Sequence, residues 1–154
     1  MELSDNIQFQ IIFQLFLAML LGCAVGLERQ YKRKEAGLRT YGLVCLGSAL
    51  FTIISLRSSF LFLDKPGIVI DPSRIIGQIV VGIGFLGAGL IIYRQSHVEG
   101  LTTAAGLWVV AGVGIAVAYS YYLIATFATF LTVLVLAGLR IFEEKLEGKK
   151  DISP

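Results

Sequence analysis

Hydrophobic residues in this chain form long runs, and short polar clusters separate them. The runs cover residues 7–27, 41–63, 75–93 and 101–139. The last of them has no charged residue, and as one helix it would be roughly 58 Å long at 1.5 Å per residue. Because a bilayer core is about 30 Å thick, this run predicts two spanning helices. We divide it at the tyrosine cluster 119–122, since tyrosine favours the membrane interface, into spans 101–118 and 121–139.

This pattern predicts an all-α polytopic membrane protein in which about five transmembrane helices form a compact bundle. The composition agrees, because 56% of the residues are hydrophobic, only 16% are charged, and the mean hydropathy is +0.79. We expect one transmembrane domain over residues 1–140 and a charged cytoplasmic tail over residues 141–154. Five spans of about 20 residues leave no room for a separate soluble catalytic domain.

Basic residues divide unequally between the two sides of the predicted bundle. Ten basic residues lie on the side of the membrane opposite the amino terminus: Arg29, Lys32, Arg33, Lys34, Arg39, Arg94, Arg140, Lys145, Lys149 and Lys150. The side of the amino terminus has three: Arg57, Lys65 and Arg74. Since lysine and arginine concentrate in cytoplasmic loops, we expect the amino terminus outside and the carboxyl terminus in the cytoplasm.

Several classes of site are disfavoured by the residues present. The formal net charge of +2 is too small to indicate a nucleic-acid partner. Cys23 and Cys45 lie in apolar runs without a CxxC pair, and His97 has no second ligand nearby, so we expect no metal site. The G-x-G-x-x-G match at 82–87 lies inside a span and indicates close helix packing rather than dinucleotide binding. With no catalytic grouping of residue types, we expect neither an enzyme nor a cofactor.

Small residues recur at helix-packing intervals in two of the spans. Gly22 and Gly26 lie in the first span, and Gly84 and Ala88 lie in the third. Close approach of backbones through small residues is a main way in which helices associate in lipid. We therefore expect these four residues to pack helices together. Some of these small-residue surfaces would meet a second copy, which predicts a homo-oligomer, with a dimer favoured.

Polar residues beside three helix ends collect on the predicted cytoplasmic side. Two leave the first span, two enter the second span and two enter the fourth. The first turns of the second and fourth helices offer unpaired backbone N–H groups that favour anions. The candidate binding site for a ligand or partner consists of these six residues: Glu28, Arg29, Arg39, Thr40, Thr102 and Thr103.

Arg39 is a cation in the first turn of its helix, where it opposes the helix dipole. We expect a compensating anion, which is either a loop carboxylate, Glu28 or Glu35, or a bound anionic group. A dedicated magnesium cage is disfavoured, because only Glu28, Glu35 and Glu99 face six basic residues in these loops. An anionic lipid headgroup, a phosphate or a carboxylate on a partner protein fits this side better.

Two other functions remain open from the residues alone. Gln78 is the one strongly polar residue inside the third span, and the glycines of 82–89 would allow that helix to break. Since transport paths use polar groups near the midplane, these residues allow an ion or small-solute transporter or channel with Gln78 on a permeation path. The third possibility is a membrane assembly module.

Four motifs occur in a fixed order, and together they resemble those of the MgtC/SapB family of bacterial inner-membrane proteins. The motifs are Gly26-Leu-Glu-Arg-Gln30, Ala36-Gly-Leu-Arg-Thr40, Gly82-Ile-Gly-Phe-Leu-Gly-Ala-Gly89 and Gly100-Leu-Thr-Thr-Ala-Ala-Gly-Leu-Trp108. The resemblance covers residues 7–139. It implies a multi-pass protein of the bacterial plasma membrane. It also implies a regulatory role in adaptation to low magnesium and in modulation of a membrane partner such as the F-type ATP synthase.

The chain departs from the better-studied family members in two respects. Those members carry a soluble ACT-like domain after the membrane domain, whereas the sequence here continues only as the tail 141–154. If the chain is an assembly module, we expect a separate chain to supply that domain. Some relatives have asparagine at the position of Thr102, which also provides a helix-capping oxygen. The interpretation we favour is a small regulatory membrane protein whose cytoplasmic face contacts a membrane partner or an anionic ligand.

Overall fold

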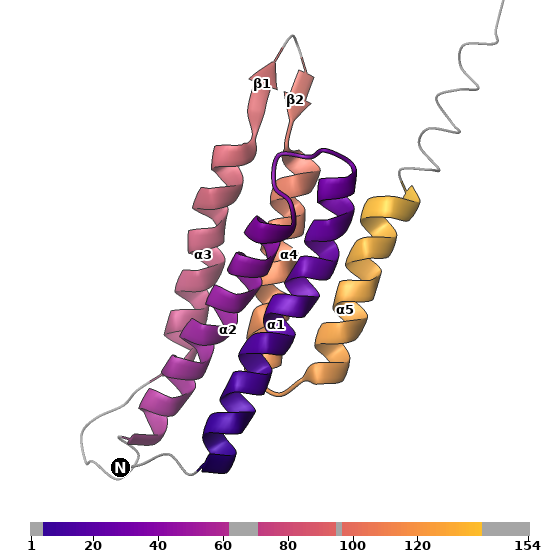
Figure 1. The fold of residues 1–154 in the computed structure, drawn as a ribbon. Coiled ribbons are helices and arrows are strands. Elements are labelled where there is room, and N and C mark those ends of the chain that lie inside the picture. The colour runs from indigo at the N-terminus through magenta and orange to yellow at the C-terminus, as the bar shows by residue number, and fades with distance from the viewer. Residues whose placement is uncertain (1–4, 62–70, 95–96, 140–154) are drawn as a thin grey trace, which may run out of the picture.

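The computed structural model describes residues 5–61, 71–94 and 97–139. Five helices run back and forth along one axis (Figure 1). They are α1 (Asp5–Tyr31), α2 (Leu38–Leu61), α3 (Ser73–Leu90), α4 (Leu101–Ala118) and α5 (Tyr122–Leu134), and the π-helical turn η1 (Val135–Leu139) extends α5. The five spans, with η1 included in the fifth, are each long and apolar enough to cross a membrane. The predicted all-α membrane bundle is confirmed; the predicted tail lies outside the described residues.

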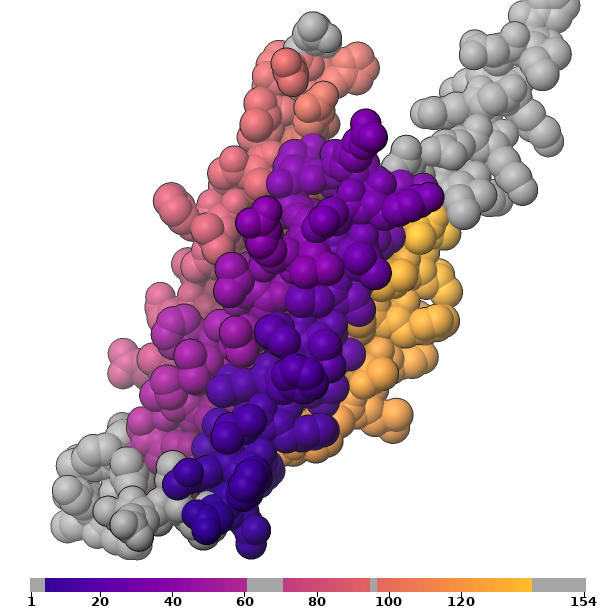
Figure 2. All heavy atoms as spheres, viewed as in Figure 1, coloured from indigo at the N-terminus to yellow at the C-terminus, as the bar shows by residue number. Residues whose placement is uncertain are grey.

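Helix α4 forms the centre of the bundle. It contacts α1, α2, α3 and α5, and half of its spanning window is buried. Helices α1 and α2 pack closely against each other and hide most of α4 in the space-filling view (Figure 2). Helix α3 is held chiefly by α4, and only 11% of its spanning window is buried. The tightly packed part of the fold is therefore α1, α2 and α4.

Glycines allow these three helices to approach closely. A Cβ atom on Gly22 would lie 2.6 Å from the Cβ of Cys45, and one on Gly26 would lie 2.7 Å from the Cα of Leu38. Both distances are shorter than carbon atoms tolerate, so side chains at these positions would push α1 away from α2. The structure places the two predicted packing glycines of the first span at this α1–α2 contact.

The predicted packing residues of the third span lie elsewhere. Gly84 and Ala88 are exposed, and no atom lies within 4 Å of a Cβ built on Gly84. Helix α3 instead packs through the buried residues Ile83 and Gly87, and a Cβ on Gly87 would lie 3.4 Å from the Cβ of Ala104. Gly84 and Ala88 thus face away from the bundle within one copy of the chain. Their contact with a second copy stays a prediction.

Several helix ends differ by a few residues from the predicted spans, and the ends of α1 and α3 have a clear structural cause. Helix α1 continues to Tyr31, four residues beyond the predicted end, because its last turns still pack against the bundle. Helix α3 ends at Leu90 rather than continuing to residue 93. The next residues form β1 (Ile92–Arg94), which pairs antiparallel with β2 (His97–Glu99). The hairpin then turns into α4 at Gly100, whose φ of +88° and contact with the Leu90 carbonyl leave no room for a side chain.

The predicted break at the tyrosine cluster coincides with the turn between α4 and α5. Ser120 has a φ of +62°, and the amides of Ser120 and Tyr121 donate back to the last turn of α4. Gln14 of α1, which is 3% exposed, donates from Nε2 to the carbonyl oxygens of Val117 and Ala118, each at 3.1 Å. The same nitrogen lies 3.1 Å from the Ser120 Oγ. A polar residue of the first span therefore caps the buried end of α4.

Candidate functional site

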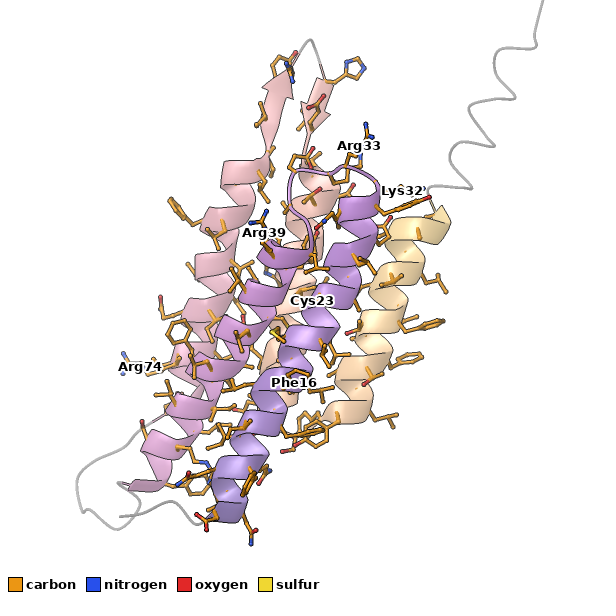
Figure 3. The ribbon with its side chains drawn as sticks, viewed as in Figure 1. Phe16, Cys23, Lys32, Arg33, Arg39 and Arg74 are labelled. Carbon is orange, nitrogen blue, oxygen red and sulfur yellow. The ribbon has the colours of Figure 1, made fainter. Side chains whose placement is uncertain are left out.

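Basic residues gather at one end of the bundle, where α1 ends, α2 and α4 begin and the hairpin projects. We call it the basic end. Figure 3 shows Lys32, Arg33 and Arg39 at this end, whereas Arg74 lies toward the other end of α3. All six candidate residues predicted from the sequence are brought to the basic end, from the end of α1 and the first turns of α2 and α4. Its described basic residues are Arg29, Lys32, Arg33, Lys34, Arg39 and Arg94.

The end of α1 is shaped by a left-handed residue. The Lys34 amide donates to the Arg29 carbonyl and the Arg33 amide donates to the Gln30 carbonyl, both at 3.0 Å. This pair of bonds is the Schellman motif, which usually has glycine at the position of Arg33. Arg33 adopts a φ of +52° there. The helix therefore ends on a cation held in a conformation that costs an ordinary residue about 1 kcal/mol.

Glu28 and Arg29 form a buried ion pair at the last turn of α1. The Arg29 Nε donates to the Glu28 Oε2 at 2.5 Å, and the two side chains are 2% and 11% exposed. The Arg29 Nη2 also donates to the Leu136 carbonyl oxygen of η1 at 3.4 Å. A buried guanidinium is stable only when it is paired in this way. The second oxygen, Glu28 Oε1, is buried without a hydrogen-bond partner.

A second polar cluster joins the loop after α1 to the start of α4. The Thr103 Oγ1 donates to the Glu35 Oε2 at 2.9 Å, and the Tyr41 hydroxyl donates to the Thr103 carbonyl oxygen at 3.0 Å. A hydrogen bond from its own backbone amide and one from Thr103 lower the pKa of the Glu35 carboxyl. Sequence reasoning missed Tyr41, which is fully buried; its hydroxyl next to the Gly-Leu-Arg-Thr motif was the available signal.

Between these clusters lies a pocket of about 660 Å³, which we call the α1–α4 pocket. Three cationic side chains line it, together with two carboxylates and the first turn of α4, and η1 forms its apolar wall. No side chain caps the amino terminus of α4, so its first N–H groups are open to an anion. The charged and polar residues of the pocket are Arg29, Arg33, Lys34, Glu35, Glu99, Thr102 and Thr103.

Arg39 and Thr40 line a neighbouring pocket of about 610 Å³, which also includes Arg33, Lys34 and Glu35. Both residues are exposed. The carboxylates expected to compensate Arg39 are used otherwise, since Glu28 pairs with Arg29 and Glu35 accepts from Thr103. Within the part of the chain that the structure describes, Arg39 forms no ion pair. Five of the six candidate residues therefore line two adjoining pockets, and the sixth, Glu28, contributes through its ion pair with Arg29.

Gln78 lies in a groove between α2 and α3 whose volume is about 550 Å³. Its walls are almost entirely apolar, and the polar side chains among them are Gln78 and Ser48. The Gln78 side chain is exposed on the outer surface of the bundle. The described residues therefore place the predicted permeation residue on a lipid-facing groove and not in a polar channel. In the same described ranges, no three His, Cys, Asp or Glu residues gather as a metal-binding group.

Comparison with known proteins identifies relatives over most of the chain. It is 44% identical over 129 residues to "Putative magnesium transporter YhiD" of Escherichia coli K12, which covers 82% of this chain and 59% of the relative. It is 39% identical over 136 residues to Protein SapB of Bacillus subtilis, covering 88% and 58%. It is 48% identical over 109 residues to Protein MgtC of Salmonella typhimurium LT2, covering 71% and 43%.

The chain spans about half the length of these curated relatives. No solved structure matches it. The sequence profile of the MgtC family matches residues 15–145, which include all four motifs at the helix ends and in α3. The family predicted from those motifs is confirmed, and the chain belongs to the MgtC family of multi-pass membrane proteins.

Proposed function

We propose that this chain is a regulatory protein of the bacterial inner membrane whose basic end faces the cytoplasm and binds an anionic ligand or an acidic segment of a membrane partner. The observation that carries the proposal is the α1–α4 pocket. There Arg29, Arg33 and Lys34 meet the uncapped amino terminus of α4. The excess of basic residues at this end favours the cytoplasmic orientation.

The three cations have different roles in the proposed site. Arg29 is fixed by Glu28 and by the Leu136 carbonyl, so its guanidinium is positioned before a ligand arrives. Arg33 and Lys34 form no ion pair among the described residues and remain available to a ligand. A fixed fork of donors together with two flexible cations suits a phosphate or a carboxylate.

Family membership supports a role in adaptation to low magnesium. It does not identify the ligand of the pocket. The family resemblance implies regulation of a membrane partner such as the F-type ATP synthase, and we extend that class of role to this chain as a proposal. Such a partner would present its acidic groups at the cytoplasmic surface. Binding of this kind requires neither a metal ion nor a catalytic step.

Magnesium transport is the second candidate, because the name of the Escherichia coli relative refers to it. A cation path would need oxygen ligands along the bundle. Gln78, the predicted path residue, lies instead in an apolar groove. This placement favours regulation over transport. If the variants do not change growth at low magnesium and no ion flux is found, the chain is expected to be a membrane assembly module without a ligand.

The experiment compares growth at low magnesium in a bacterial host that lacks its own family member. We expect the double variant Arg33→Ala/Lys34→Ala to lose the function, and Gln78→Ala and Arg74→Ala to keep it, at equal amounts of protein in the membrane. Ion flux in proteoliposomes is measured in parallel for magnesium, potassium and protons. Saturable flux that Gln78→Ala abolishes would overturn the regulatory proposal.

Orientation is tested separately with cysteines placed at each end. Lys34→Cys and Arg74→Cys are treated with a membrane-impermeant thiol reagent in intact cells, in a background where Cys23 and Cys45 are replaced by serine and alanine. Arg74→Cys is expected to react and Lys34→Cys to react only in inverted membrane vesicles. The reverse pattern would place the basic end outside the cytoplasm and contradict the proposal.

A further inference from the structure

The α1–α4 pocket does not end at its charged residues. A second, apolar groove of about 350 Å³ runs between α4 and α5. Thr102, Val135 and Leu136 line both the pocket and the groove, so the two cavities adjoin. Together they form an amphipathic cavity with a charged upper part at the basic end and an apolar lower part among the spanning helices.

The charged part contains a guanidinium that still has donors to give. Arg29 is 2% exposed, and its Nε and Nη2 atoms donate to Glu28 and Leu136. Its Nη1 atom has no protein partner among the described residues, although the residue lines the pocket. Because Arg29 lines the pocket and is held in place by Glu28 and Leu136, its guanidinium can donate a charge-assisted hydrogen bond to an anionic ligand there.

The apolar part of the cavity faces outward between two helices. Small residues of α4, Ala105 and Gly106, leave space opposite Leu131 of α5. Ala105 and Leu131 are exposed in the isolated chain and therefore lie at the lipid surface of the bundle. A flexible hydrocarbon chain from the bilayer would bury apolar surface in this groove.

We propose that this cavity binds one anionic phospholipid, with its phosphate in the α1–α4 pocket and one acyl chain in the α4–α5 groove. This inference deepens the proposed function and rests on it, because it names the ligand of the same pocket. An anionic headgroup is favoured over a zwitterionic one by the charges of the basic end. Among the described residues there, six are basic and three, Glu28, Glu35 and Glu99, are acidic.

Native mass spectrometry of the purified full chain tests the inference. The protein is titrated with phosphatidylglycerol, phosphatidylcholine or inorganic phosphate, and bound molecules are counted. We expect one phosphatidylglycerol to bind saturably and more tightly than phosphatidylcholine. The variant Arg33→Ala/Lys34→Ala is expected to weaken this binding by about tenfold or more. Each cation near an anionic headgroup contributes about fivefold in affinity, and the variant removes two of them. Arg29 is left unchanged, because its loss would leave Glu28 buried without a partner.

A groove-filling variant separates lipid from free phosphate. Ala105→Leu places a larger side chain in the α4–α5 groove, and Gly82→Leu fills the other apolar groove, between α2 and α3, as the matched control. We expect Ala105→Leu to weaken phosphatidylglycerol binding and Gly82→Leu to leave it unchanged.

The possible results separate this inference from the proposed function. Equal binding of phosphatidylglycerol and phosphatidylcholine, or binding unchanged by Ala105→Leu, would overturn the lipid inference. Tight binding of inorganic phosphate that depends on Arg33 and Lys34 but not on Ala105 would overturn it as well, yet would support an anionic ligand in the pocket. If no anion binds and Arg33→Ala/Lys34→Ala retains low-magnesium growth, the proposed function fails too.

Discussion

The hydroxyl of Thr103 donates a hydrogen bond to Glu35, 2.9 Å away, and so fastens the loop after α1 to the first turn of α4. The two residues lie 68 positions apart in the sequence. Their contact forms one side of the α1–α4 pocket, in which both residues take part. The bond is strongest while Glu35 is ionised, because a carboxylate accepts a hydrogen bond more strongly than a protonated carboxyl does.

This bond predicts how stability depends on pH. The pKa of Glu35 is lowered by its own backbone amide and by Thr103, so ionised Glu35 is favoured in the folded state. The stabilisation is fully present above the unfolded pKa of about 4.3 and is lost as the pH falls through the lower, folded pKa. Thermal unfolding in detergent between about pH 6 and pH 3 measures it. We expect Thr103→Val to flatten this decline; an unchanged decline would contradict a role for the bond.

Arg33→Gly is predicted to raise stability and to weaken anion binding. The φ of +52° suits glycine, so the substitution removes strain of about 1 kcal/mol while it removes a cation from the pocket. The unfolding midpoint and the affinity for phosphatidylglycerol check the two effects. Lys32→Gly is the matched control, because Lys32 has no positive φ and glycine there should not stabilise. A less stable Arg33→Gly protein would show that the conformation is not strained.

Gln14→Leu is predicted to destabilise the bundle by about 1 kcal/mol, the usual scale of a hydrogen bond between membrane helices. The substitution leaves the Val117 and Ala118 carbonyls without the donor that reaches them from α1. The unfolding midpoint in detergent is again the measurement. Gln10→Leu serves as control, since Gln10 is exposed and makes a single 3.5 Å bond to Ser120. Equal effects of the two substitutions would contradict the capping role of Gln14.

Alanine should destabilise the bundle at Gly22 and leave its stability unchanged at Gly84. A Cβ at Gly22 would overlap α2, and overpacking of this kind costs about 1–3 kcal/mol. At Gly84 a Cβ meets no atom within 4 Å, so Gly84→Ala should leave the single bundle as stable as before. Leucine at Gly84 tests the predicted dimer, because a bulky residue would disturb a contact made through this surface. A dimer that persists with Gly84→Leu would show that the contact lies elsewhere.

The hydrophobic pattern of the sequence predicts most of the fold. The run 101–139 carries too many apolar residues for one span, and the tyrosine cluster marks the turn at which the structure divides it. The hairpin was missed because Ile91, Ile92 and Tyr93 continue the apolar run of α3 without a visible break. Helix α3 ends where Ile91 takes an extended conformation, and the close approach of Gly100 to the Leu90 carbonyl beside it exists only in the folded chain.

The location of the site was predicted from the sequence, but the partners of its charged residues were not. The distribution of charge and the direction of each helix predicted that the six candidate residues lie at one end of the bundle, as the structure shows. They could not show that Glu28 pairs with its neighbour Arg29, because neighbours in a helix normally point apart, and here the Leu136 carbonyl of a distant turn helps to position the guanidinium. The partner of Glu35 likewise comes from α4. Contacts between residues far apart in the sequence require the folded chain.

The most direct test of the central claim is photo-crosslinking from position 34 in intact membranes. A photoreactive amino acid replaces Lys34 in the full chain, and position 74 at the opposite end carries it in the control. We expect position 34, unlike position 74, to capture an anionic lipid or an acidic segment of a membrane protein. Removing a second cation with Arg33→Ala should reduce this capture. Equal products from the two positions, or capture that Arg33→Ala leaves unchanged, would contradict an anion-binding pocket at the basic end.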